Sequence, residues 1–139
     1  MSASSPPSGE RVTYVDSSAI VKLAVSEPES TALRRYLSRR KPLITSALAR
    51  TEVARALLPL GPDAVRRGDE ALRRMQLLRV NDRVLAEAGR LQPTALRSLD
   101  AIHLASARQL GPTLQRVVTY DTRMADAARL IGWSVSSPA

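Results

Sequence analysis

The sequence predicts an α/β fold in which a central parallel sheet is covered by helices on both faces. Short apolar runs alternate along the chain with longer segments whose apolar residues recur at helical spacing. A strand that is followed by a helix returns to the sheet parallel to the first strand, so this alternation predicts a three-layer α/β/α domain. With 139 residues, 44% of them hydrophobic, the chain is expected to bury the core of one domain.

The first predicted unit is a strand at residues 12–15 that runs directly into a helix. Asp16 follows the strand, and beyond it Ala19, Ile20 and Leu23 recur at helical spacing. An Asp directly after a strand is a favoured helix N-cap.

A second helix is predicted to open at Ser26, with Pro28 in its first turn, and to end before Pro42. Residues 43–45 then form a second short strand. The charged residues between these points are expected to form a solvated face of the helix.

The next two helices are predicted on either side of a Pro and Gly break. The first is capped by Thr45 or Ser46 and runs to Leu58, and the second opens at Pro62. Gly68 weakens the middle of the second helix, because glycine is a poor helix former.

The second half of the chain repeats the alternation, and no internal sequence repeat is found. In order, we expect a strand at 77–80, a helix from Asn81 or Asp82 to Leu91, a helix over 99–110, a strand at 117–120, a helix from Asp121 or Thr122 to Gly132, and a closing strand at 133–135.

Composition limits the chemistry that the chain can perform. Cys is absent, which excludes disulfides, thiolate zinc sites and Cys nucleophiles. The 21 Lys and Arg residues outnumber the 13 Asp and Glu residues, for a formal charge of +8, and a field of this sign attracts nucleic acid. A genome that favours Arg codons would give the same bias. Since there are three Tyr, one Trp and no Phe, we expect phosphate contacts rather than a large base-stacking platform.

The two ends of the predicted domain lie near residues 12 and 136. Residues 1–11 are rich in Ser and Pro and are expected to be a disordered tail rather than a signal peptide. No run approaches the roughly 18 apolar residues of a membrane span. We therefore expect a cytoplasmic protein without membrane association, built as a single domain over 12–136.

Four carboxylates occupy positions where an unpaired charge is costly, at the end of an apolar strand or on the apolar side of a helix: Asp16, Glu52, Asp100 and Asp121. Asp16 and Asp121 each follow a predicted strand, and ligands bind where the carboxyl ends of parallel strands converge. Glu52 shares its helix stripe with Leu48 and Ala56. The pattern predicts that the acids meet in space.

Each acid taken alone has a structural explanation. Asp16 and Asp121 can act as N-caps, and Glu52 can form an ion pair. Asp100 can interact with its helix dipole, which is worth only about 0.3–1 kcal/mol. Together the four favour a divalent metal site, because Mg²⁺ prefers carboxylate and water oxygens. Whether one or two ions bind stays open.

Further polar residues lie beside the acids in the sequence. Candidates for orienting an acid or a phosphate are Ser17, Ser18, Thr119 and Asp126. Capping, strand propensity or plain solvent exposure are the alternatives for these four. Arg97 and Arg123 are candidates for binding substrate phosphates, with ordinary surface charge as the alternative. His103, three residues after Asp100, is expected to fill a polar niche near the core rather than to act in catalysis.

Four segments of the chain resemble the acidic motifs of PIN-domain ribonucleases. They occur in the family's order and cover nearly everything from 12 to 135: VTYVDSSAIVKL, LARTEVARAL, SLDAIHLASA and VVTYDTRMADAARLIGW. Their context and the compact chain are similar to the VapC toxins of VapBC toxin-antitoxin systems. No motif acid is replaced.

The resemblance implies a PIN-like three-layer fold and an endoribonuclease that requires Mg²⁺, for which Mn²⁺ can substitute. It also implies a homodimer, inhibition by a cognate VapB-like antitoxin, and RNA products with a 5′-phosphate and a 3′-hydroxyl. Carried over residue by residue, the family's metal-binding acids fall on Asp16, Glu52, Asp100 and Asp121. The RNA that is cleaved is not implied.

Other function classes account less well for the same residues. A phosphoacceptor domain would need a Lys after a late strand, where neither Lys22 nor Lys41 lies. A phosphatase with an Asp nucleophile would need a second Asp two residues later, but Ser17 and Ser18 follow Asp16. A PIN nuclease of RNA processing, and a non-catalytic protein that binds RNA or an antitoxin, stay as alternatives.

Overall fold

The computed structural model describes residues 11–139 and contains one five-stranded sheet in the order β3-β2-β1-β4-β5. All four strand pairs are parallel. The strands are β1 (Val12–Val15), β2 (Leu43–Ser46), β3 (Gln76–Leu78), β4 (Leu114–Val118) and β5 (Val135–Ser136). The α-helices are α1 (Ser17–Ala24), α2 (Ser30–Ser38), α3 (Ala49–Leu57), α4 (Pro62–Arg73), α5 (Asp82–Ala88), α6 (Ser98–Arg108) and α7 (Thr122–Ile131). Short 3₁₀ turns lie at η1 (Leu58–Leu60) and η2 (Gly111–Thr113).

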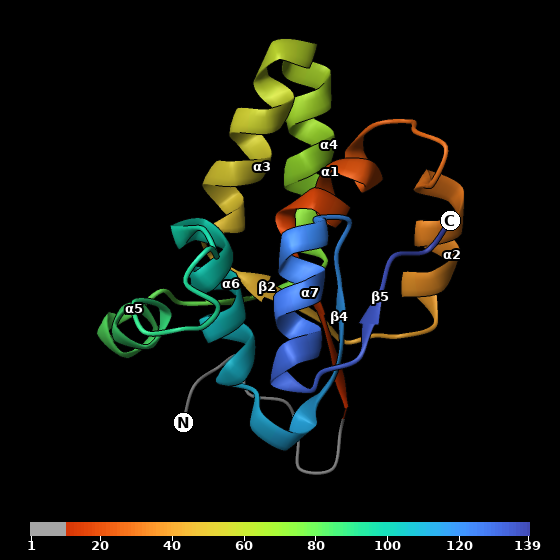
Figure 1. The fold of residues 1–139 in the computed structure, drawn as a ribbon. Helices are drawn as coiled ribbons and strands as arrows, with labels where there is room; N and C mark the ends of the chain where they lie inside the picture. Colours follow the sequence, from red (N-terminus) through yellow and green to blue (C-terminus); the bar gives the residue numbers. More distant parts are fainter. Residues whose placement is uncertain (1–10) are drawn as a thin grey trace.

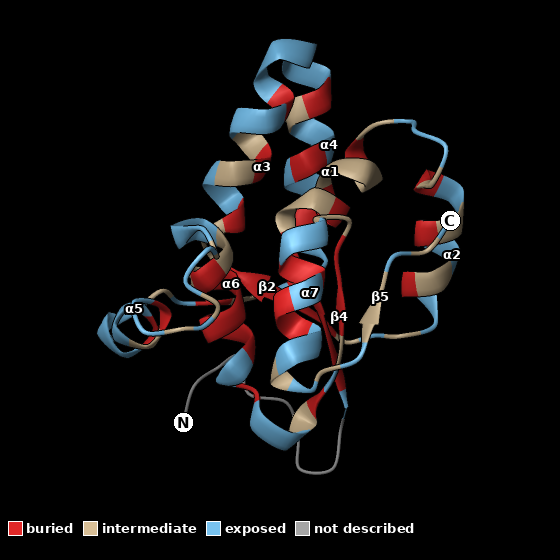
Figure 2. Ribbon diagram, in the orientation of Figure 1, coloured by how far each residue is buried: buried red, intermediate tan, exposed pale blue. Residues whose placement is uncertain are grey.

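Helices cover the sheet on both faces, as the sequence predicts (Figure 1). On one face Val15, Leu43 and Val118 pack with apolar residues of α1 to α4. On the other face Tyr14 and Val117 pack with residues at the end of α6. Alternate residues of a strand point to opposite faces, so β1 and β2, which are buried throughout, are covered on both sides (Figure 2). The predicted three-layer α/β/α fold is therefore confirmed.

The order of the strands and helices is as predicted, but several boundaries differ. Helix α2 begins at Ser30 and not at Ser26. The Ser30 hydroxyl accepts a hydrogen bond from the Glu27 amide and donates to the carbonyls of Lys22 and Val25. These bonds hold the preceding segment as a turn that joins α1 to α2.

Other boundaries move by a few residues. Helix α3 begins at Ala49, because the Ser46 hydroxyl accepts from the Leu48 amide in a turn after β2. The strands predicted at 77–80 and 117–120 lie earlier, at β3 and β4. The predicted tail at 1–11 lies outside the described residues, apart from Arg11.

Helices α3 and α4 form an antiparallel pair that extends above the sheet in Figure 1. Gly68 faces α3 at the contact between them. A Cβ atom at Gly68 would lie 2.6 Å from Leu57 Cδ1 and 2.9 Å from Val53 Cγ1. The glycine that weakens the helix in sequence terms therefore permits the close approach of α3 to α4.

None of the helices in the described part of the chain is long and apolar enough to cross a membrane.

Candidate active site

The candidate site lies where the strand order of the sheet changes direction. From β1 the chain goes first to β2 on one side and later to β4 on the other side. Asp16 directly follows β1, and Thr119 and Asp121 follow β4. Crevices at such a switch point are the usual ligand sites of open parallel sheets, because neighbouring connections diverge there.

Asp16 is the most buried of the four acids, with 2% of its surface exposed. Its Oδ1 atom accepts hydrogen bonds from the Ser18 hydroxyl at 2.7 Å and from the Ala19 amide at 3.1 Å. Its Oδ2 atom accepts from the Thr119 hydroxyl at 2.6 Å. Burial raises the pKa of Asp16, although the bonds from Thr119 and Ser18 act to lower it. Asp16 thus caps α1, as predicted, and belongs to a polar network.

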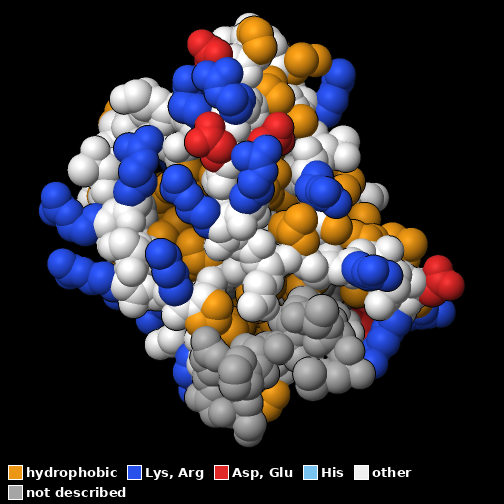
Figure 3. All heavy atoms as spheres, turned by 180° about the vertical axis from the view of Figure 1, so that it is seen from behind, with side chains coloured by type: hydrophobic (Ala, Val, Ile, Leu, Met, Phe, Trp, Pro, Cys, Tyr) orange, Lys and Arg blue, Asp and Glu red, His pale blue; other side chains and the backbone are white. Residues whose placement is uncertain are grey.

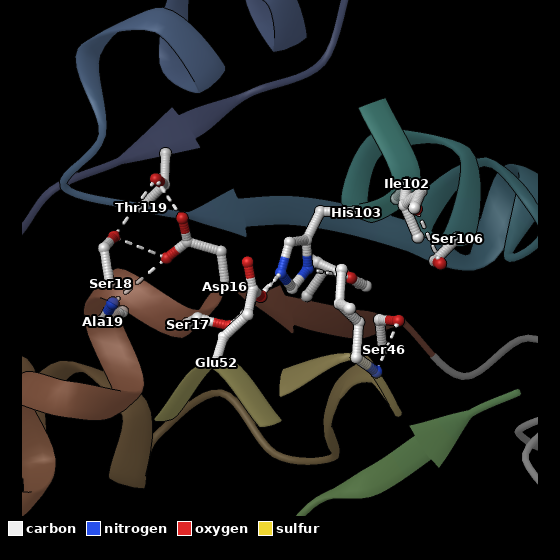
Figure 4. A network of polar contacts seen from close by, with 12 residues as sticks. Asp16, Ser17, Ser18, Ala19, Ser46, Glu52, Ile102, His103, Ser106 and Thr119 are labelled. Atoms are coloured by element: carbon white, nitrogen blue, oxygen red, sulfur yellow. Dashed lines mark hydrogen bonds and ion pairs between the residues drawn. The ribbon is translucent and has the colours of Figure 1, made fainter. Parts of the chain in front are cut away.

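Ser18 and Thr119 connect the ends of β1 and β4. The Ser18 hydroxyl accepts from the Tyr120 amide at 3.0 Å, and the Thr119 hydroxyl accepts from the Asp121 amide at 3.0 Å. Each hydroxyl donates to Asp16 at the same time. The two side chains therefore fix the Asp16 carboxylate relative to the backbone that carries Asp121 (Figure 4).

Glu52 on α3 faces the same network from the other side of Asp16 (Figure 4). Its Oε1 atom lies 2.6 Å from the Ser17 hydroxyl and 2.5 Å from His103 Nε2. His103 Nδ1 lies 2.7 Å from the Tyr14 hydroxyl. Burial acts to raise the pKa of Glu52, but the hydrogen bond and charge of His103 and the bond from Ser17 outweigh it, so that pKa is lowered. Glu52 is therefore ionised at neutral pH.

Asp100 in the first turn of α6 has an unsatisfied carboxylate oxygen. No donor among residues 11–139 reaches its buried Oδ2 atom. Burial raises the pKa of Asp100, the charges of Asp121 and Asp16 raise it further, and Arg97 and His103 act to lower it. Asp121 and Asp16, which are distant in sequence, therefore lie close enough to Asp100 for their charges to raise its pKa.

Asp121 caps α7, as predicted. Its Oδ1 atom accepts from the backbone amides of Arg123 and Met124 at 2.9 and 3.1 Å. The side chains of Arg97, at the start of α6, and Arg123, in the first turn of α7, are exposed. Arg97 is near enough to Asp100 to act on its pKa, and Arg123 is two residues from Asp121 in the sequence.

Asp126 is placed differently from the other candidates. Its side chain is 77% exposed and lies 3.7 Å from Arg129 one turn later on α7. The structure therefore brings Ser17, Ser18 and Thr119 into contact with the acids and leaves Asp126 at the surface.

The donor set suits a hard divalent cation, although the side chains do not form a closed cage. Within residues 11–139, no three His, Asp or Glu side chains are arranged to hold a metal ion as they stand. A cation would relieve both the unsatisfied Asp100 oxygen and the repulsion of Asp100 by Asp121 and Asp16. Carboxylate oxygens are the ligands that Mg²⁺ prefers, and Mg²⁺ usually retains several waters. The residues present thus fit Mg²⁺ or Mn²⁺.

His103 lies in a polar niche near the core, as predicted, but its contact with Glu52 was not predicted. Tyr14 is missed entirely. The available signals are periodicities: Tyr14 and Asp16 are two apart on a strand, and Asp100 and His103 are three apart on a helix. The residues of each pair share a face, so Tyr14 and His103 could have been proposed to line the site beside Asp16 and Asp100.

Comparison with known proteins agrees with this architecture. The PIN domain family matches residues 13–130. Ribonuclease VapC46 of Mycobacterium tuberculosis is 60% identical over 125 residues, which cover 90% of this chain and 96% of that protein. Ribonuclease VapC47 of the same species is 38% identical over 130 residues, again covering 90% and 96%.

Two solved structures share the fold at low sequence identity. VapC20 of M. tuberculosis, a sarcin-ricin loop cleaving toxin, has a TM-score of 0.70 at 20% identity and covers 83% of this chain and 94% of that one. A toxin-antitoxin complex from Klebsiella pneumoniae has a TM-score of 0.70 at 21% identity and covers 91% and 98%. The sequence relatives and the acidic site lead to one assignment: this chain belongs to the PIN-domain family and, within it, to the VapC ribonuclease toxins.

Proposed function

We propose that the chain is a Mg²⁺-dependent endoribonuclease that acts as the toxin of a toxin-antitoxin module. The observation that carries the proposal is the buried, unsatisfied oxygen of Asp100, whose pKa is raised by burial and by the charges of Asp121 and Asp16. A protein retains such a costly group where a ligand neutralises it. The names of the relatives, ribonucleases VapC46 and VapC47, support RNA as the substrate.

The four acids would hold the cation, with Asp100 as a direct ligand and Glu52 orienting water beside it. When bound, Mg²⁺ supplies Lewis-acid stabilisation of phosphate charge and lowers the pKa of water. The chain itself fixes Asp16 through the Ser18 and Thr119 hydroxyls, so that this carboxylate is preorganised. Mn²⁺ can take the place of Mg²⁺.

Arg97 and Arg123 would contact phosphates of the RNA. Both side chains are exposed next to an acid that lines the site. Arg donors match phosphate oxygens in a bidentate geometry. By the family resemblance, the products would carry a 5′-phosphate and a 3′-hydroxyl.

The biological setting that we propose is a cytoplasmic toxin held inactive by a VapB-like antitoxin and active as a homodimer. The fold shared with the chain in the Klebsiella complex agrees with an antitoxin partner. Expression of the chain alone should arrest growth, and co-expression of the antitoxin encoded beside it should restore growth. Harmless expression of protein that cleaves RNA in vitro would contradict the toxin role.

The direct test is RNA cleavage by the purified chain. We expect cleavage with Mg²⁺ or Mn²⁺ and none in EDTA. Asp100→Asn should reduce the rate by at least about 100-fold, because a neutral amide is a poor ligand for a hard cation. Asp63→Asn is the matched control, since Asp63 is 73% exposed and pairs with Arg66 on α4. Cleavage by Asp100→Asn in EDTA at the rate of the wild type with Mg²⁺ would refute the proposed mechanism.

A further inference from the structure

The single histidine of the chain connects Glu52 to the core of the domain. His103 is 2% exposed, and both of its ring nitrogens have partners. Nε2 lies 2.5 Å from Glu52 Oε1 and 3.2 Å from the Ser17 hydroxyl, and Nδ1 lies 2.7 Å from the Tyr14 hydroxyl. The rings of Tyr14 and His103 also meet edge to face, with centroids 5.9 Å apart. The imidazole is therefore held at both ends.

The protonation form of His103 decides the direction of these hydrogen bonds, and the chemistry of the partners fixes it for the neutral imidazole. An ionised carboxylate can only accept, so the hydrogen between His103 and Glu52 belongs to Nε2. A neutral imidazole protonated at Nε2 has an acceptor at Nδ1, and the Tyr14 hydroxyl is then the donor. A phenol carries its proton at neutral pH, so the Tyr14 hydroxyl has a hydrogen to donate. With the neutral imidazole, donation runs from Tyr14 to His103 to Glu52.

The Glu52 carboxylate is immobilised through one oxygen only. Both the imidazole and the Ser17 hydroxyl bond to Oε1, which leaves Oε2 available to a cation or to its water. The side chain of Glu52 has several rotatable bonds and is 21% exposed, so the two bonds to Oε1 restrict the rotation that its stem still permits. A carboxylate held in this way binds a cation without first losing that freedom.

We propose that His103 is a positioning residue of the metal site, which holds Glu52 in its binding orientation, and that Tyr14 selects the imidazole tautomer that does so. This inference rests on the proposed function, because it assigns Glu52 to a metal site. The alternative is that His103 merely fills space between α6 and β1.

The first test is the tautomer of His103. Since the chain has one histidine, long-range ¹H–¹⁵N NMR of tag-free, metal-free protein reports this imidazole alone. We expect the Nε2–H form in the wild type and a mixture of tautomers in Tyr14→Phe. Tyr36→Phe is the matched control, because its hydroxyl bonds to Ser136 away from the acids. An Nδ1–H tautomer or a doubly protonated ring in the wild type at neutral pH, or no change in Tyr14→Phe, would overturn the inference.

The second test is the affinity for Mn²⁺, measured by electron paramagnetic resonance of the free ion and by the Mn²⁺ dependence of RNA cleavage. Tyr14→Phe should weaken Mn²⁺ binding by about 10-fold, as for other groups that orient a metal ligand, with little change in cleavage at saturating Mn²⁺. His103→Gln, which keeps a donor toward Glu52, should retain more affinity than His103→Leu. Equal affinities of these two variants would show that His103 only fills space.

The two proposals fail in different ways. Wild-type protein that does not bind Mn²⁺ would overturn the proposed function together with the role of His103. If the wild type binds Mn²⁺ and both Tyr14→Phe and His103→Leu bind it equally tightly, the role of His103 is overturned and the metal-dependent nuclease is left intact.

Discussion

Asp100 is the residue at which stability and function conflict most clearly. Its buried oxygen lacks a donor within residues 11–139, and nearby acids of other elements raise its pKa. The charged form is therefore less stable in the folded protein than in the unfolded chain. Natural proteins accept such losses at functional sites, where a ligand reverses them.

The first prediction at this scale is that Asp100→Asn raises the thermal stability of the metal-free protein while it abolishes cleavage. The amide removes the repulsion from Asp16 and Asp121, and each 1 kcal/mol is worth roughly 3 °C in a chain of this size. Thermal unfolding in EDTA checks the increase. Added Mg²⁺ should stabilise the wild type by mass action and leave the variant unchanged. Asp63→Asn, as the exposed control, should respond to Mg²⁺ as the wild type does.

The second prediction concerns pH. A carboxyl whose pKa is raised on folding contributes stability that is complete below its unfolded pKa, about 3.9 for Asp, and that is lost as pH rises through its folded pKa. The advantage of Asp100→Asn over the wild type in EDTA should therefore be largest at neutral pH and should close as pH falls toward about 4. A stability difference between Asp100→Asn and the wild type that does not depend on pH would show that the charge of Asp100 is not its cause.

At the scale of elements, the starts of three helices bring three of the acids together. Asp16 and Asp121 cap α1 and α7 through backbone amides, and Asp100 lies in the first turn of α6. Parallel strands place the starts of α1 and α7 at the same edge of the sheet. Local capping and the global topology thus serve the same site.

The packing of α3 against α4 carries the next prediction, because it sets the position of the helix that bears Glu52. Gly68→Ala should destabilise the protein, since overpacking costs about 1–3 kcal/mol and exceeds the gain of about 1 kcal/mol in helix propensity. Gly89→Ala is the control, because its added Cβ would meet nothing closer than 3.6 Å and its backbone is helical. That change should be neutral or stabilise by about 0.4–1 kcal/mol. Urea denaturation of both variants measures the difference, and equal effects would contradict the packing argument.

At the scale of the whole molecule, the acidic site lies within a strongly basic protein. The formal charge is +8, and Figure 3 shows Lys and Arg side chains spread over one face of the molecule. A field of this sign concentrates RNA near the surface, whereas the acids repel phosphate locally unless a cation is bound. The long-range attraction of RNA to the surface and the metal-dependent binding of phosphate at the acids are thus separate steps.

Salt dependence of RNA binding tests this separation. We expect an Asp16→Asn background to bind RNA without cleaving it. In that background, Arg97→Ala and Arg123→Ala should each weaken affinity for single-stranded RNA and reduce the slope of log K against log salt by about 0.7. Fluorescence anisotropy between 50 and 200 mM salt, about the range over which phosphate contacts are screened, gives the slope. Arg129→Ala is the control, because Arg129 lies on α7, as Arg123 does, and is paired with Asp126. Equal slopes for all three variants would assign the attraction to net charge alone.

Local sequence patterns were sufficient to predict the order of strands and helices and the capping roles of Asp16 and Asp121. These features depend on periodicity and on the preferences of single residues, which act over a few positions. The start of α2 could not be predicted in the same way. It depends on the Ser30 hydroxyl reaching the carbonyls of Lys22 and Val25, which only the folded turn brings near.

The sequence by itself therefore determined the α/β architecture, the family motifs and the residue types of the site. Only the tertiary structure decided that Asp16 is bound by Thr119 across 103 residues of chain, that Glu52 is held by His103, and that Asp126 faces solvent. The physical reason is that these contacts join different elements. Their distances are set by how the helices pack on the twisted sheet, which no local pattern encodes.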